Sequence, residues 1–509
     1  MAFASLFSAQ TSLLDAHLVT VEMDTAKGLQ SFSIVGLPDK AVEESRDRVS
    51  AALKNSDFEK SPKFKAPKLN NMKIVVSLAP ADLPKTGPLF DVPIALSYLV
   101  ATGELEALND KQIFFGELSL DGQVRPTTGV LPLVQKALFE GFAEAFVPKK
   151  NAAEAALVED ITIYPVETIG QLVEHLRGTN SIEPYTRFAL REERAVERHL
   201  ESIRGQEHAK RGLTIAAAGG HNIALFGPPG TGKTMLAKAL CSLLPPLSHD
   251  TALEVTGIHS IAGTLHETLI TQPPLRSPHH TASYVSLVGG GTTPRPGEVT
   301  LAHRGVLFLD EFPEFDKRVI NALRQPLEDG EVSITRAKGS ATFPSDFILV
   351  AALNPCPCGF YGTSKCSCSP GNLQRYRQKI SGPIMDRIDM WIEVGAVRHE
   401  KLLEQPKNTK ESDEVRRIVA QARAIQLERF RLPERLNSGM TPTGLAHHAK
   451  LTDACAQILN KAAEKMSLSP RAYHRCIKLA RTIADLEHST DIQEQHVLEA
   501  LQYRPKQEL

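Results

Sequence analysis

A complete phosphate-binding motif constrains this chain more than any other feature of its sequence. The apolar run Ile223–Phe226 is followed at once by Gly227-Pro228-Pro229-Gly230-Thr231-Gly232-Lys233-Thr234, which matches the pattern G-x-x-x-x-G-K-[ST] in full. A helical pattern over Met235–Leu244 comes next. Strand, glycine loop and helix in this order are the context that the motif requires. The alternative is a chance glycine loop before a helix. We predict an α/β nucleotide-binding domain with this loop at its centre.

Each residue type in the loop has a physical reason to bind a nucleoside triphosphate. Gly227, Gly230 and Gly232 let the backbone wrap phosphate oxygens, and together with Thr231 they aim N–H groups at these oxygens, while the N-terminus of the following helix adds its positive dipole. Lys233 is expected to reach the β- and γ-phosphates of ATP, and the hydroxyl of Thr234 to ligate Mg²⁺.

Two further apolar runs end in residues suited to phosphoryl transfer. The run Gly305–Leu309 delivers Asp310 and Glu311, which are expected to hold Mg²⁺ and to polarise the attacking water. The run Phe347–Ala352 ends near Asn354, whose amide could orient water against the γ-phosphate. The alternatives are a core strand ending in acidic surface residues and a turn-forming asparagine before a proline.

The pattern along the chain predicts three parts of an α/β protein. Residues 1–175 alternate strand-like and helical segments, residues 176–199 form a charged linker, and residues 200–395 carry nearly all the chemistry. Residues 396–509 read as helical. The predicted strands and helices outside the central part are Ser33–Val35, Met72–Val76, Ile113–Phe115, Ala41–Lys54, Pro93–Ala101, Glu411–Arg431 and Thr452–Met466.

Four of the seven cysteines cluster in a short stretch, as Cys356-x-Cys358 and Cys366-x-Cys368. Four thiolates on one loop can enclose Zn²⁺ tetrahedrally, which would leave no coordination position open for water. Free or redox-active thiols are the alternative. We therefore expect a structural role in shaping a DNA-facing loop rather than a catalytic one. Local positive charge comes from the basic neighbours Lys365, Arg375, Arg377 and Lys379.

Bulk properties limit the partners. The formal net charge is −1, so any binding of DNA must depend on local basic patches. We find no apolar run long enough to span a bilayer and no signal peptide, and we expect a cytoplasmic protein without a membrane partner.

The chain resembles AAA+ ATPases, and more narrowly the magnesium-chelatase-like branch that includes the YifB/ComM group. The segments that carry the likeness are Arg276–His280, Val288–Gly291, Pro296–Glu298, His303–Glu311, Leu323–Glu328, Asn354–Gly359 and Asp386–Asp389. The resemblance implies a homo-hexameric ring that acts as a DNA helicase and drives branch migration on single-stranded or branched DNA.

The resemblance also implies roles for individual residues. Asn354 resembles the sensor-1 residue, Arg387 the arginine finger offered to a neighbouring subunit, and Arg471 the sensor-2 arginine of a helical lid. Gly205-Gln206 resembles the turn on the adenine side. The residue-level alternatives are an ion pair of Arg387 with Asp386 or Asp389, and a plain surface position for Arg471.

Residues 1–175 resemble the Lon-protease-like domain of the same family. Leu89 stands where Lon proteases have the nucleophilic serine, and the lysine position falls near Pro132-Leu133. Without a nucleophile and base there is no acyl chemistry. We expect an adaptor or assembly module.

Two segments are candidates for DNA contact. Leu275–Gly297 resembles an insertion in the second helix of the AAA+ core, and Glu331–Phe343 alternates like a hairpin with a Lys338-Gly339 tip. The resemblance places both toward a central pore, where Arg336 and Lys338 would meet phosphates. For Glu331–Phe343 the alternative is a solvated hairpin.

For the whole chain the alternatives are a protein-remodelling ATPase, with residues 1–175 as its adaptor, and a chelatase-type ATPase subunit.

Overall fold

The computed structural model describes residues 3–186, 199–291, 295–336, 339–361, 364–379, 382–397, 409–432 and 435–505. The chain forms two compact units. Unit 1 comprises Met1–Glu192 with Leu253–Ile270, and unit 2 comprises Glu193–Ala252 with Thr271–Leu509. The described helices include none that combines the length and the apolar character needed to cross a bilayer.

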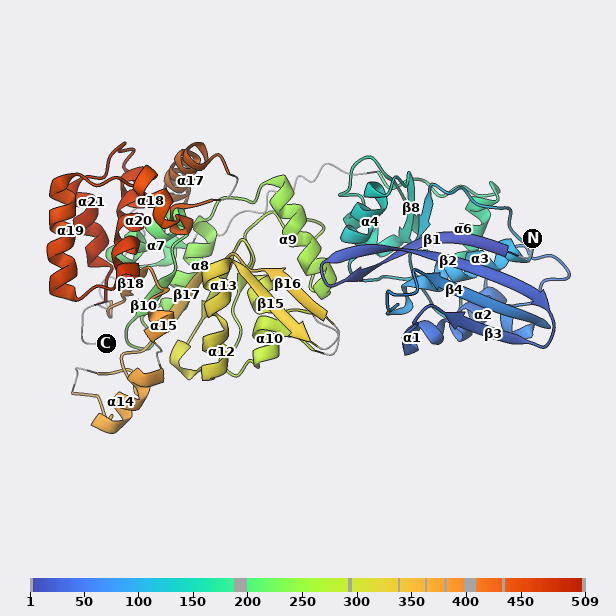
Figure 1. Ribbon diagram of the computed structural model, residues 1–509, viewed down its shortest axis with the longest axis horizontal. Helices are drawn as coiled ribbons and strands as arrows, with labels where there is room; N and C mark the ends of the chain where they lie inside the picture. The colour runs from blue at the N-terminus through green and yellow to red at the C-terminus, as the bar shows by residue number, and fades with distance from the viewer. Residues whose placement is uncertain are drawn as a thin grey trace. The chain divides into compact units, whose positions relative to one another are not determined.

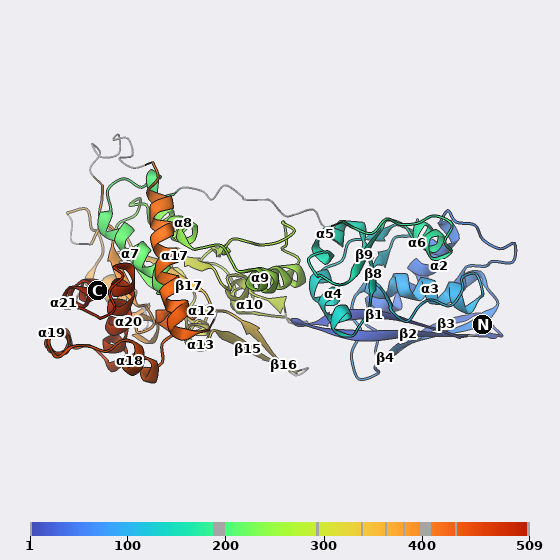
Figure 2. The same cartoon turned by 90° about the horizontal axis from the view of Figure 1, so that it is seen from above.

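Unit 1 is built on a mixed four-stranded sheet in the order β1-β2-β4-β3. Its strands are β1 (Phe3–Ser12), β2 (Asp15–Lys27), β3 (Ser31–Val35) and β4 (Met72–Ala79). Buried and exposed side chains alternate along β2 and β4, as expected of strands with one face in the core. The helices α2 (Ser45–Asn55) and α3 (Asp91–Ala101) lie on one face of this sheet (Figure 2).

A second, smaller sheet of unit 1 is parallel, in the order β5-β8-β9. The remaining elements of residues 1–186 are β5 (Gln112–Phe114), β6 (Glu117–Leu118), β7 (Val124–Arg125), β8 (Glu144–Pro148), β9 (Thr162–Val166), α1 (Lys40–Glu43), α4 (Val130–Phe139), α5 (Ala152–Ala155) and α6 (Ile169–Leu176). Leu89 and Leu133 are both buried in the apolar core beside this sheet.

The segment Leu253–Ile270 belongs to unit 1, although the sequence places it after the phosphate-binding loop. It contains most of α9 (His249–Ala262). The backbone N–H of Gly129 donates to the Ser260 hydroxyl at 3.0 Å, and that hydroxyl donates to the buried carboxylate of Glu154. A buried carboxylate needs such donors, so this contact ties the segment to unit 1.

Unit 2 contains a parallel five-stranded sheet in the order β11-β14-β17-β10-β18 (Figure 1). The strands are β11 (Leu275–Arg276), β14 (Val306–Leu309), β17 (Ile348–Leu353), β10 (Ile223–Phe226) and β18 (Met390–Glu393). Every residue of β14 and β17 is buried. Continuous apolar runs of this kind are typical of parallel strands covered on both faces.

The other strands and α-helices of residues 199–397, apart from α9, surround this sheet or extend from it. They are α7 (Glu207–Gly219), α8 (Lys233–Leu243), α10 (Tyr284–Val288), β12 (Gly289–Gly290), β13 (Arg295–Pro296), α11 (Glu298–Leu301), α12 (Lys317–Ala322), α13 (Arg324–Asp329), β15 (Glu331–Arg336), β16 (Gly339–Pro344), α14 (Pro370–Lys379) and α15 (Gly382–Met385). The antiparallel pairing of β15 with β16 confirms the predicted hairpin.

The described part of residues 396–509 is helical, with one isolated bridge between Leu451 and Ile492. The helices are α17 (Glu411–Phe430), α18 (Pro442–His448), α19 (Asp453–Met466), α20 (Pro470–Leu486) and α21 (Glu494–Gln502). The hydroxyls of Thr452 and Ser469 accept backbone N–H groups at the starts of α19 and α20. These caps explain why both helices begin where they do.

A buried carboxylate connects the sheet of unit 2 to α20. Asp389, which precedes β18, accepts from the N–H of Asn222 at 3.0 Å and lies 3.3 Å from a guanidinium nitrogen of Arg475. Burial alone would raise the pKa of Asp389, but the charge of Arg475, the hydrogen bond and charge of His221 and the charge of Lys478 together outweigh it and hold the pKa well below its ordinary value.

We expect Asp389→Asn to destabilise unit 2 by about 3 kcal/mol at neutral pH, because Arg475 loses its buried counter-charge. A carboxyl group with a depressed pKa stabilises the fold above its unfolded pKa of about 4, and this contribution is lost as the pH falls below that value. Urea unfolding followed by circular dichroism should therefore show a deficit that is full at pH 7 and shrinks in acid. The exposed Asp386, changed to Asn, is the matched control, and an equal loss in both variants would contradict this role.

Candidate functional site: a phosphate-binding edge of the unit 2 sheet

The phosphate-binding loop joins the end of β10 to the start of α8. Gly230 and Gly232 have φ values of 75° and 91°, a region that favours glycine because it lacks a Cβ atom. A Cβ on Gly227 would lie 2.1 Å from the carbonyl oxygen of Val394, so the neighbouring chain leaves no room for a side chain there. The loop thus points backbone N–H groups and the positive end of α8 toward the same space.

Lys233 is folded back into this loop. Its ammonium group donates to the carbonyl oxygens of Gly227 at 2.7 Å and Pro228 at 2.9 Å, and to Oδ1 of Asn354 at 3.0 Å. Burial lowers the pKa of Lys233, while the nearby carboxylates of Asp310 and Glu311 act in the opposite direction. The ammonium therefore lies between the phosphate loop and the acidic end of β14.

Asp310 and Glu311 follow β14 directly. The hydroxyl of Thr234 donates to Oδ2 of Asp310 at 3.3 Å, so the two predicted Mg²⁺ ligands are brought together. Hydroxyl and carboxylate oxygens are ligands that Mg²⁺ prefers, which makes this pair suitable for the ion. Glu311 has a φ of 50°, and its carboxylate lies 3.3 Å from Nδ1 of His280.

Asn354 follows the end of β17, the strand between β10 and β14. Its side chain accepts from Lys233, and its carbonyl oxygen accepts from the hydroxyl of Tyr376 at 3.0 Å. Burial raises the pKa of Tyr376, which keeps this hydroxyl protonated. The asparagine is thus fixed on both sides at the edge where the phosphate loop lies.

The two candidate arginines meet at one carboxylate. Glu328, near the end of α13, lies 2.5 Å from a guanidinium nitrogen of Arg387 and 3.2 Å from one of Arg471. The hydrogen bond from Arg387 lowers the pKa of Glu328. Glu328 is thus a carboxylate that pairs with Arg387 among the described residues. Arg471 is largely exposed at the start of α20.

Gln206 lies apart from these side chains, at the start of α7. Its φ is 62°, and its side-chain amide donates to the carbonyl oxygen of Gly395 at 2.6 Å. This bond links the start of α7 to the segment that follows β18.

Sequence reasoning missed His280 and Glu328 as individual residues. Each lies within a segment that carried the family resemblance, yet no motif or spacing singled it out. Only the contacts with Glu311, Arg387 and Arg471 make them noticeable.

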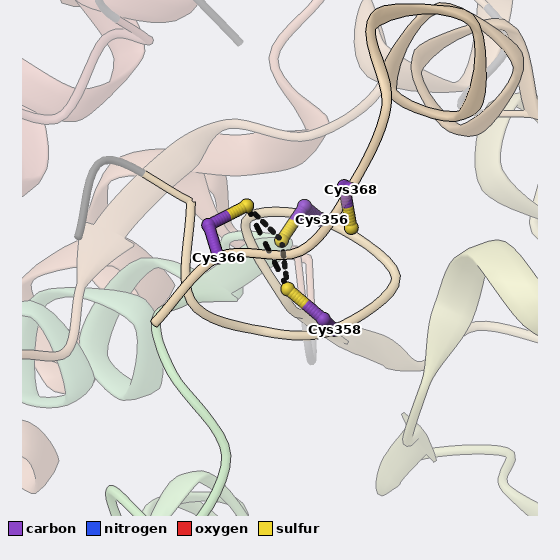
Figure 3. A group of neighbouring side chains, drawn as sticks. All are labelled: Cys356, Cys358, Cys366 and Cys368. Atoms are coloured by element: carbon purple, nitrogen blue, oxygen red, sulfur yellow. Dashed lines mark hydrogen bonds between the residues drawn. The ribbon is translucent and has the colours of Figure 1, made fainter. Parts of the chain in front are cut away.

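The four clustered cysteines converge on one point (Figure 3). Their sulfur atoms all lie within 4.8 Å of one another, and Cys356 is fully buried. Backbone N–H groups of Phe360 and Ser367 donate to the sulfur of Cys358 and lower the pKa of that thiol to about 6. This donor set suits a soft or borderline metal ion such as Zn²⁺.

Comparison with known proteins decides the family. Residues 199–402 match the family "Magnesium chelatase, subunit ChlI", residues 21–151 match "Subunit ChlI of Mg-chelatase", and residues 409–504 match the C-terminal region of subunit ChlI. The chain is 43% identical to the competence protein ComM of Haemophilus influenzae, over 99% of this chain and 98% of that protein. It is 40% identical to YifB of Escherichia coli, over 96% of this chain and 95% of that protein.

The chain belongs to the ComM/YifB family of magnesium-chelatase-like AAA+ proteins. A more distant relative is the DNA replication licensing factor Mcm6 of Drosophila melanogaster, 25% identical over 59% of this chain and 36% of that protein. The ComM/YifB resemblance inferred from the motifs is thereby confirmed.

The candidate DNA-contact residues Arg336 and Lys338 belong in sequence to the last position of β15 and to the segment between β15 and β16. Arg336 ends β15, but its side chain and the whole of Lys338 lie outside the described residues. Their expected contact with phosphates stays a prediction.

We expect Glu311→Gln to bind ATP normally and to hydrolyse it at least about a hundredfold more slowly, because the amide cannot take a proton from water. Fluorescent-nucleotide binding and phosphate release measure the two effects separately. Glu314→Gln is the matched control. Glu314 lies three residues after Glu311, and its carboxylate pairs with the ammonium group of Lys379 at 2.7 Å. Full hydrolysis by the Glu311 variant would remove this residue from the role of base.

Proposed function

We propose that this protein is an ATP-driven DNA motor, a hexameric helicase that promotes branch migration in homologous recombination or natural transformation. The observation that carries the ATPase part is the meeting of Lys233, Thr234, Asp310 and Asn354 at one sheet edge. The DNA part is supported by similarity to a competence protein along nearly the whole chain and to a replication licensing factor along part of it.

The nucleotide chemistry follows from the residues at this edge. In the proposal the loop N–H groups and Lys233 bind the phosphates of ATP, Thr234 and Asp310 hold Mg²⁺, and Gln206 lies on the adenine side. Glu311 takes a proton from the attacking water, which Asn354 helps to orient. Bound Mg²⁺ neutralises charge on the phosphate oxygens.

We infer that a neighbouring subunit completes the site. Phosphoryl transfer spreads negative charge over the γ-phosphate, and an arginine offered in trans offsets it. Arg387 is assigned to this role, and Arg471 to the lid of its own subunit. Glu328 holds both guanidinium groups in the single chain. Assembly would exchange Glu328 for phosphate, which makes hydrolysis depend on the ring.

The contact with DNA is assigned to the β15–β16 hairpin. A net charge of −1 gives the whole protein little attraction for a polyanion, so a local contact must supply it. In the proposal Arg336 and Lys338 contact phosphates without reading sequence, as a translocating motor requires.

We also propose that Cys356, Cys358, Cys366 and Cys368 bind one Zn²⁺ ion. The convergence of four thiols in one place supports this assignment over scattered free thiols. With four protein ligands the ion has a structural role.

ATP hydrolysis should rise several-fold when branched DNA is added, and the protein should displace a strand or move a junction only while ATP is hydrolysed. Phosphate release and gel-based displacement of a labelled four-way junction measure both. Lys233→Ala is the control, because it removes the ammonium group from the phosphate loop. If the wild-type protein shows neither stimulation nor displacement, the helicase proposal is wrong, and a protein-remodelling ATPase or a chelatase-type subunit takes its place.

Replacing both Arg336 and Lys338 by alanine should weaken DNA binding at every sequence. The slope of log affinity against log salt should become shallower by about 0.7 to 0.9 for each phosphate that the variant no longer neutralises. Fluorescence anisotropy at several salt concentrations measures this slope. The double change Lys461→Ala with Lys465→Ala on the exposed side of α19 removes the same charge elsewhere. Equal slopes for the two double variants would place the DNA-binding surface away from the hairpin.

A further inference from the structure

The spacing of the four sulfur atoms is that of a site for a single ion. The Cys356 sulfur lies 3.3 Å from that of Cys358 and 4.0 Å from that of Cys366, and the Cys358 and Cys366 sulfurs are 3.7 Å apart (Figure 3). A tetrahedral zinc ion with bonds of about 2.3 Å holds its sulfurs about 3.8 Å apart. All four cysteines point their sulfurs inward from one loop.

One end of this loop begins at the nucleotide site. Cys356 follows Asn354 after a single residue, and Asn354 accepts a hydrogen bond from Lys233. The other end returns to the same residue, because Cys368 lies just before α14 and Tyr376 of that helix donates to the Asn354 carbonyl oxygen. The cysteines therefore close a loop whose two ends meet at Asn354.

The first turn of the four-cysteine loop, just after Cys358, lies against the phosphate loop. Gly359 has a φ of 82°, and a Cβ atom there would lie 2.5 Å from Cδ of Pro229. Pro229 is the third residue of the motif Gly227–Thr234. The two chain segments are closely packed at this point, so the position of the four-cysteine loop and the position of Pro229 depend on each other.

We propose that the four-cysteine loop is a metal-dependent brace of the nucleotide site, in which zinc fixes Asn354 and supports Pro229 and thereby sets the affinity for nucleotide. The proposal rests on the proposed zinc site and adds a consequence for the phosphate loop. The physical reason is chain entropy: four bonds to one ion restrict a loop that would otherwise sample many conformations. Loss of the ion releases both Asn354 and the part of the loop at Gly359 that packs against Pro229.

The brace differs from a zinc site that only shapes a surface for DNA. A surface site leaves nucleotide binding unchanged when the metal is lost. A brace weakens nucleotide binding in the absence of any DNA, and that difference can be measured.

The test uses the full-length protein, purified without chelators or added metal. Metal content is measured by mass spectrometry, and the affinity for a fluorescent ADP analogue is measured without DNA. Cys366→Ser removes one ligand. Cys241→Ser is the matched control, because that sulfur donates to the carbonyl of Pro273 at 3.3 Å, a bond that a serine hydroxyl can keep. Gly359→Ala leaves every thiol in place and disturbs the turn at Gly359 together with its contact with Pro229.

We expect about one zinc per chain in the wild type, the Cys241 variant and the Gly359 variant, and a loss of zinc in the Cys366 variant. Both Cys366→Ser and Gly359→Ala should weaken nucleotide binding about tenfold, within the range by which residues outside a site alter its affinity. Stripping zinc from the wild type with a mercurial reagent and a chelator, and then restoring zinc after a reducing thiol, should weaken and recover the affinity. This reversal separates the brace from a folding defect.

Two results would overturn the inference, and they differ from each other. A wild-type protein without stoichiometric zinc refutes the metal site itself. A Cys366 variant that lacks zinc, yet binds the ADP analogue as tightly as the wild type, leaves the zinc site in place and refutes the brace.

Discussion

The parallel pairing of β10 with β17, and of β17 with β14, brings Gly227, Asn354 and Asp310 to one edge of a single sheet. The rest of unit 2 depends on this constraint. Lys233 can contact Asn354, and Thr234 can contact Asp310, only because their strands end side by side. The buried apolar strands supply rigidity, and the polar residues just beyond their ends supply chemistry.

In unit 2, contacts between side chains from distant segments hold the candidate reactive groups, some at this edge and some at the Glu328 carboxylate. His280 contacts Glu311, Tyr376 contacts Asn354, and Glu328 contacts Arg387 and Arg471. Each is a contact that ATP or a neighbouring subunit could exchange for another. In our proposal the single chain keeps Arg387 on Glu328 until a neighbouring subunit offers it a phosphate, which would make hydrolysis depend on the ring.

Much of this arrangement can be predicted from the sequence, since it depends on local patterns. The motif Gly227–Thr234 and the apolar runs before Asp310 and Asn354 locate the nucleotide edge, and the hairpin is visible from alternation. Contacts between segments far apart in sequence cannot be predicted from such local patterns. Glu328 and His280 belong to no spacing rule. The grouping of Leu253–Ile270 with unit 1 rests on long-range contacts, among them the hydrogen bond from Ser260 to the buried carboxylate of Glu154 and the packing of Leu253 and Leu269 against the core of unit 1. The predicted helix Ala41–Lys54 is interrupted at Glu44, where α1 ends and α2 begins, a break that periodicity does not reveal.

That a neighbouring subunit completes the phosphate site is tested most directly by mixing two variants, Glu311→Gln and Arg387→Ala. Each homogeneous variant should hydrolyse ATP very slowly. In an equal mixture, interfaces that pair an intact Glu311 with an intact Arg387 form at random, so hydrolysis should recover to at most about a quarter of the wild-type rate. Co-purification of two different tags establishes that mixed particles form. Mixed particles that remain inactive, or an Arg387 variant that is fully active alone, would contradict completion of the site in trans.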